Sequence, residues 1–108
     1  MATTTLNLGA VVDWESFHDA CLNAFGFPDF YGRNMDAWID CLSYLDEDGG
    51  MCRYKLLPGE RLEIVLPNFE KFSREYREIC TGLLECTAFV NQRYVGSGDI
   101  PRLGLIPV

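Results

Sequence analysis

The chain has 108 residues, of which 48% are hydrophobic and 23% charged, a composition typical of one globular domain. Sixteen acidic residues against nine basic ones give a net charge of −7, and such a surface repels nucleic acid and anionic lipid. We therefore expect no nucleic-acid partner and no membrane partner. Solubility alone explains the charge, or else a basic protein partner does.

The N-terminal sequence has neither the basic start nor the long apolar stretch of a secretion signal. No apolar run approaches the roughly 20 residues of a membrane span. The five cysteines are scattered, without a C-x-x-C pair, which favours reduced thiols over disulfides or zinc. We expect a cytoplasmic protein that is a monomer when free and that uses no metal and no cofactor.

The first elements are a strand starting within 4–12 and a helix over 14–25. Asp13 is a suitable N-cap for this helix, and Gly26 followed by Pro28 marks its end. His18, the single histidine, lies at the edge of the apolar stripe and is interpreted as a structural residue. The stripe itself should face the core: Trp14, Phe17, Cys21 and Phe25.

A second helix is predicted over 34–45, with Asn34 as its N-cap. Its buried stripe consists of apolar residues three or four positions apart. Asp36 and Asp40 share a different flank, so both carboxylates should face solvent together. Like charges at this spacing repel by about 0.2–0.5 kcal/mol, which makes their placement informative. The stripe is Met35, Trp38, Ile39, Leu42 and Leu45.

The second half of the chain is predicted as loop, strand, helix, strand and tail. Residues 46–60 are a loop in which MCRYKLL is either a short edge strand or disordered. RLEIVLP at 61–67 is a strong central strand, 69–86 a helix, and TAFVNQRYV at 87–95 the next strand. The glycines and prolines of 96–108 favour extended chain. This order predicts an α/β fold in which a small parallel sheet is covered by a single layer of helices.

The sequence offers little catalytic chemistry. It has no nucleophile motif and no phosphate loop, and no cysteine has a base nearby. Asp36 and Asp40 could act as an acid–base pair or bind Mg²⁺, but neighbouring positions on an open helix face provide neither a cleft nor enough ligands. We therefore predict that the protein is not an enzyme. A metal-assisted hydrolase is the least favoured hypothesis.

The remaining hypothesis is that the protein binds a partner. Two exposed carboxylates beside a tyrosine and a polar turn suit a cationic surface, above all arginine, whose planar fork meets carboxylates with two hydrogen bonds. The plain alternative is a solvated helix face without a partner.

The segment FYGRNMDAWIDCL, residues 30–42, resembles the signature of the barstar family of intracellular ribonuclease inhibitors. It has the pattern aromatic-Tyr-Gly-x-Asn-apolar-Asp-Ala-x-x-Asp. Upstream, FHDACLNAFGFPDFYG keeps the same apolar–histidine start and the same gap to the proline. The resemblance covers 13–45 closely and 61–95 only as an order of strand, helix and strand.

The resemblance implies a single domain over 1–108, with 46–60 as an insertion loop and 96–108 as a C-terminal extension. It implies an immunity protein that blocks the active site of a basic extracellular ribonuclease, with acidic residues imitating RNA phosphates. Alternatively, the fold serves as a non-inhibitory regulatory module for another basic protein. The implied contacts are an approach loop of Phe30, Tyr31, Gly32 and Asn34, the carboxylates of Asp36 and Asp40, and Glu78, with Glu75 as the alternative to Glu78.

The chain also departs from the family pattern. Arg33 stands where barstar has an acidic residue, Phe30 replaces a tyrosine, and Ile39 replaces a contact tryptophan, while Trp38 points toward the core. We expect the fold and the general role to survive these changes, but not the identity of the target ribonuclease.

Overall fold

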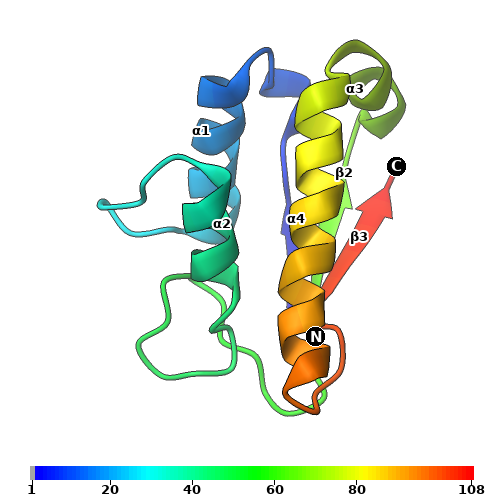
Figure 1. Ribbon diagram of the computed structural model, residues 1–108. Helices are drawn as coiled ribbons and strands as arrows, with labels where there is room; N and C mark the ends of the chain where they lie inside the picture. Colours follow the sequence, from blue (N-terminus) through cyan, green and yellow to red (C-terminus); the bar gives the residue numbers. More distant parts are fainter. Residues whose placement is uncertain (1) are drawn as a thin grey trace.

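Three parallel strands form an open sheet within residues 2–108, the part of the chain that the computed structural model describes (Figure 1). The strands are β1 (Ala2–Thr5), β2 (Leu62–Leu66) and β3 (Leu103–Pro107), in the spatial order β1-β2-β3. Ile64 of the central strand is paired in register with Thr4 on one side and Leu105 on the other. The predicted α/β class with a small parallel sheet is confirmed, and so is the central position of the strand at 62–66.

The helices cover one face of this sheet (Figure 1). They are η1 (Leu8–Ala10), α1 (Trp14–Phe25), α2 (Met35–Leu42), α3 (Phe69–Glu75) and α4 (Arg77–Gly96). On β2, the side chains at 62, 64 and 66 are buried beneath the helices, whereas Glu63 and Val65 on the opposite face are partly exposed. A single layer of helices therefore packs on the sheet, as predicted. The core lies between the two layers.

Helix α1 begins and ends as its sequence predicts. The Asp13 side chain accepts the backbone N–H of Ser16, and the Ser16 hydroxyl accepts the backbone N–H of Asp13, which completes a capping box. Gly26 ends the helix in the left-handed region at φ 67°, where glycine carries no Cβ penalty. At the core, the Phe25 ring meets the Trp38 ring of α2 edge to face at 6.2 Å.

The strand predicted at 87–95 is wrong, because these residues continue α4. The segment is rich in β-branched and aromatic residues, but its buried side chains do not alternate. Thr87, Val90 and Tyr94 continue the helical spacing that begins at Ile79 and Leu83, and burial of this stripe overrides strand propensity. The helix predicted over 69–86 is also interrupted, since Tyr76 has φ −125° and ψ 57° and separates α3 from α4.

Three further segments refine the predictions. The first strand lies at Ala2–Thr5 and so starts before the predicted 4–12, and a 3₁₀ turn at Leu8–Ala10 occupies the rest of that range instead of strand. The 46–60 segment is a loop without a strand, yet it is tied to the domain, because the Leu56 N–H donates to the Leu45 carbonyl. The tail at 96–108, which the resemblance treats as an extension, is extended over 103–107 and supplies β3 of the sheet.

Candidate partner-binding site

The loop that leads into α2 sends two adjacent aromatic side chains in opposite directions. Phe30 is 77% exposed, whereas Tyr31 is only 6% exposed and belongs to the core. The Tyr31 ring packs on Phe27 with 4.7 Å between ring centroids. Of the two predicted contact residues, Phe30 therefore offers surface to a partner, and Tyr31 supports the loop from beneath.

A buried hydrogen bond holds this loop to α1. The Tyr31 hydroxyl lies 2.7 Å from Nδ1 of His18, which is buried. Burial lowers the pKa of His18, and the nearby Arg33 charge lowers it further, with a smaller opposing effect from Asp19. Burial also raises the pKa of Tyr31, so the phenol keeps its proton. His18 has a structural role here, as predicted from its place at the edge of the apolar stripe.

The turn Gly32-Arg33-Asn34 starts α2 and sets its direction. The Asn34 carboxamide accepts the Ala37 N–H at 2.8 Å and donates to the Gly32 carbonyl at 3.2 Å, confirming Asn34 as the N-cap. A Cβ at Gly32 would lie only 3.3 Å from the Asn34 amide nitrogen, so a side chain there would press on the cap. Arg33 adopts a left-handed φ of 53°, and its guanidinium pairs with Asp19 at 2.9 Å.

Both aspartates of α2 are exposed, as their shared flank predicts. Asp36 lies in the first turn, at the positive end of the helix. Burial raises the pKa of the Cys86 thiol on α4, and the negative charges of Glu85 and Asp36 raise it further. Asp36 therefore lies near α4, and its charge reaches the part of that helix around Cys86.

Asp40 has an internal partner that the sequence did not predict. Its Oδ1 lies 3.4 Å from Nη1 of Arg93 on α4, and the same nitrogen donates to the Ser43 hydroxyl at 3.1 Å. With 87–95 assigned to a strand, Arg93 could not be placed beside α2. Only the continuation of α4 brings it there.

The chain is similar over most of its length to a known protein family. The family model described as "Barstar (barnase inhibitor)" matches residues 1–105.

The chain belongs to the barstar family.

A Bacillus subtilis (strain 168) protein named "Putative ribonuclease inhibitor YrdF" is 42% identical over 57 residues, which are 52% of this chain and 48% of that protein. The chain thus spans about half the length of this curated relative. The barstar resemblance seen in residues 30–42 is confirmed for the family, and the matched region extends into β3.

In this barstar-family chain, the acidic residues expected on the later helix fall at the break between α3 and α4. Glu78 is exposed in the first turn of α4, where a helix N-terminus favours negative charge. Glu75, the alternative, ends α3 and lies 3.9 Å from Lys71. Both glutamates are exposed, and within residues 2–108 Glu78 has no such ion pair.

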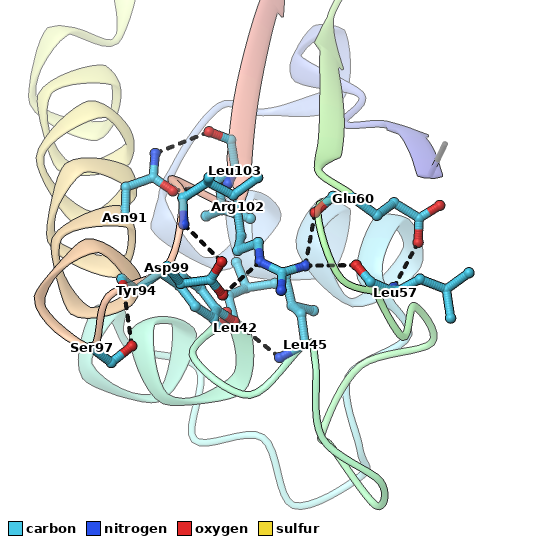
Figure 2. Close-up of polar contacts among 11 residues, drawn as sticks. Leu42, Leu45, Leu57, Glu60, Asn91, Tyr94, Ser97, Asp99, Arg102 and Leu103 are labelled. Carbon is cyan, nitrogen blue, oxygen red and sulfur yellow. Dashed lines mark hydrogen bonds and ion pairs between the residues drawn. The ribbon is translucent and has the colours of Figure 1, made fainter.

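A network of buried polar groups fixes the C-terminal end of α2 against α4 (Figure 2). The Tyr94 hydroxyl donates to the Leu42 carbonyl at 2.8 Å and accepts the Leu45 N–H at 3.0 Å, so it caps this end of α2. Nearby, the buried Arg102 donates to the Asp99 carboxylate at 2.9 Å and to the carbonyls of Leu57 and Glu60. These contacts join α4, β3 and the 46–60 loop around the helix that carries the aspartates.

The remaining candidates for chemistry are the potential metal ligands and the cysteine thiols. Within residues 2–108, no cluster of three or more His, Cys, Asp or Glu side chains could hold a metal ion. Burial raises the pKa of the Cys41 thiol to about 11, helped by Cys52 and Asp40. The pKa values of the thiols at 21, 52, 80 and 86 shift in the same direction.

Among the described residues, no helix is long and apolar enough to cross a membrane.

Proposed function

We propose that this protein inhibits a basic extracellular ribonuclease by covering its active site with the Phe30 loop and the acidic face of α2. The observation that carries the proposal is the pair of exposed aspartates on α2 in a chain that matches the barstar family over residues 1–105. The name of the Bacillus subtilis relative supports the same role. In this role the protein is a cytoplasmic immunity protein, monomeric when free.

The mechanism is electrostatic imitation of the substrate. A ribonuclease binds RNA phosphates with cationic side chains. Asp36 and Asp40 lie one helical turn apart, and each carboxylate can accept two hydrogen bonds from a guanidinium. The net charge of −7 draws a basic enzyme toward the inhibitor, and the exposed Phe30 ring supplies apolar contact from the loop. Once these groups occupy the cleft, RNA is excluded.

No chemical step is assigned to this chain. His18 is hydrogen-bonded to Tyr31 beneath the loop, and the raised pKa values of the thiols keep them protonated at neutral pH. The purified protein should therefore show no RNA hydrolysis of its own, with or without divalent metal. Turnover abolished by Asp36→Asn would contradict the inhibitor role and favour the metal-assisted hydrolase.

The decisive experiment measures inhibition and binding kinetics with barnase, the enzyme in the family's description, and with a panel of other basic secreted ribonucleases. Asp40→Ala is compared with Glu47→Ala, since Glu47 is an exposed acid in the 46–60 loop outside the proposed surface. Asp40→Ala should weaken the complex by about 2–5 kcal/mol because it leaves a partner charge buried and unpaired. Glu47→Ala should alter mainly the association rate and its salt dependence.

The outcomes separate the candidate functions. Equal, small effects of the two variants would mean that the aspartate pair is only a solvated helix face. Binding to a basic protein without loss of ribonuclease activity would support the regulatory module instead. Barnase and barstar are themselves a standard example of electrostatic steering and of a dominant interface aspartate. The expected weakening by Asp40→Ala therefore follows a known case in this family.

A further inference from the structure

One of the proposed contact carboxylates is already paired inside the chain. Asp40 is 59% exposed and lies 3.4 Å from the Arg93 guanidinium, which is 44% exposed. Within residues 2–108, neither Asp36 nor Glu78 has such an ion pair. The position expected to matter most for binding is therefore the one that carries its own counter-ion.

Arg93 has two contacts besides the one with Asp40. It also donates to the Ser43 hydroxyl at 3.1 Å, and its guanidinium carbon lies 5.1 Å from the centre of the Phe89 ring on the same helix. A cation–π contact with an aromatic ring and a hydrogen bond to a second residue both favour this position of the side chain. These contacts would hold the guanidinium beside α2 if Asp40 took another partner.

We infer that Arg93 is a specificity-determining residue of this surface, acting as an internal competitor for the Asp40 carboxylate. This inference rests on the proposed function. The Arg93 contact is long and uses one nitrogen, whereas strong charge-assisted bonds span about 2.7–2.9 Å. A partner arginine that meets both carboxylate oxygens can replace it. A lysine, a single point charge, competes less well, so the surface selects arginine over lysine.

The test compares Arg93→Gln with Arg74→Gln. Arg74 pairs with Glu70 at 3.0 Å on the exposed surface of α3, so both variants remove one positive charge and one exposed ion pair from a helix. Long-range attraction of a cation changes nearly equally in the two, and the part of their difference that Asp40→Asn removes reports the short-range effect at Asp40. The probes are barnase, an octa-arginine peptide and an octa-lysine peptide, measured at 0.15 M salt, where the Debye length is about 8 Å.

Arg93→Gln should bind the peptides about two- to five-fold more tightly than Arg74→Gln, the range set by an exposed ion pair. The gain should be larger for octa-lysine, and adding Asp40→Asn should abolish it. Arg93→Lys keeps the charge but loses the planar guanidinium beside the Phe89 ring, and it should give an intermediate gain. This variant also preserves the test if Arg93→Gln unfolds, which thermal unfolding of each variant would reveal.

Equal peptide affinities for Arg93→Gln and Arg74→Gln, or a gain that persists in the Asp40→Asn background, would overturn the inference. Failure of the proposed function gives a different pattern. There the wild-type protein does not inhibit barnase or the ribonuclease panel, while the Asp40-dependent gain for the peptides is still observed. If Arg93→Gln and Arg74→Gln inhibit the ribonuclease tightly and equally, the proposed function stands. Arg93 then does not determine the specificity of the surface.

Discussion

Nδ1 of His18 and the hydroxyl of Tyr31 lie 2.7 Å apart, and this contact joins the middle of α1 to the loop that precedes α2. Both residues are buried. Their neighbour Phe30 points outward from the same loop. The shape of the proposed binding loop thus depends on a titratable group that is kept neutral in the core.

The first prediction concerns acid sensitivity. The pKa of His18 is lowered from its ordinary 6.5 in the folded protein, mainly by burial. The unfolded chain therefore binds more protons below about pH 6.5. The free energy of unfolding should be constant near neutral pH and fall as the pH drops from 6.5 toward the lowered value. Urea unfolding of the wild-type protein at pH 7.5 and pH 5.5 would measure this loss.

Two variants separate the charge from the hydrogen bond. His18→Gln removes the titrating group and should reduce the dependence on pH over this interval. Tyr31→Phe should lower stability by about 1 kcal/mol at both pH values, while the dependence on pH remains. A wild-type pH dependence that His18→Gln leaves unchanged would assign the effect to other groups.

The second prediction concerns the Tyr94 hydroxyl, which caps α2 from a neighbouring helix. Tyr94→Phe leaves a buried carbonyl and a buried N–H without this partner and should destabilise the fold by about 1–3 kcal/mol. Burial raises the pKa of Tyr94 to about 12, so the loss should be the same at pH 6 and pH 8. The exposed Tyr44 is the control, and Tyr44→Phe should change the urea midpoint little. Equal effects would contradict the capping role.

The third prediction concerns Arg102, whose guanidinium joins Asp99 to two loop carbonyls (Figure 2). Arg102→Met keeps much of the length of the side chain but leaves these acceptors unpaired, and it should destabilise the fold by about 3–5 kcal/mol. The control Arg74→Met, on an exposed ion pair, should change stability by about 0.5 kcal/mol or less. Chemical denaturation measures both. A small effect of Arg102→Met would show that water replaces the guanidinium.

The first half of the fold follows from local sequence signals. Asp13, Gly26 and Asn34 delimit two helices through capping chemistry, which depends only on near neighbours. The outward flank of Asp36 and Asp40 follows from the helical period. The binding loop is predicted less well, because Phe30 and Tyr31 are both aromatic and only the packing on His18 decides which one is buried.

The second half of the fold depends on long-range contacts that local sequence signals do not reveal. TAFVNQRYV has the composition of a strand, but its long-range partners are α2 and the sheet, and these stabilise a helix with Tyr94 toward α2. The third strand therefore lies at 103–107, in a tail whose glycines and prolines give a weaker strand signal. The same error hid the Arg93–Asp40 pair, since a contact between residues 53 positions apart depends on the whole of α4 being helical.

The last prediction separates binding from folding within one dipeptide. Phe30 is 77% exposed, so Phe30→Ala should change the free energy of unfolding by about 0.5 kcal/mol or less. If Phe30 is an aromatic anchor of the proposed interface, the same variant should weaken ribonuclease binding at least about tenfold, or 1.4 kcal/mol. Inhibition titration and urea unfolding of one preparation give both quantities.

Its neighbour should behave in the opposite way. Tyr31→Ala removes a buried ring that packs on Phe27 and His18, and such truncations cost about 3–5 kcal/mol of stability. Any loss of inhibition by Tyr31→Ala should follow the fraction of unfolded protein and should recover at lower temperature or with a stabilising osmolyte. The loss caused by Phe30→Ala should not recover, because the missing ring belongs to the surface and not to the fold. If Phe30→Ala inhibits as well as the wild type, the loop tip lies outside the interface, and the contact surface is confined to the helices.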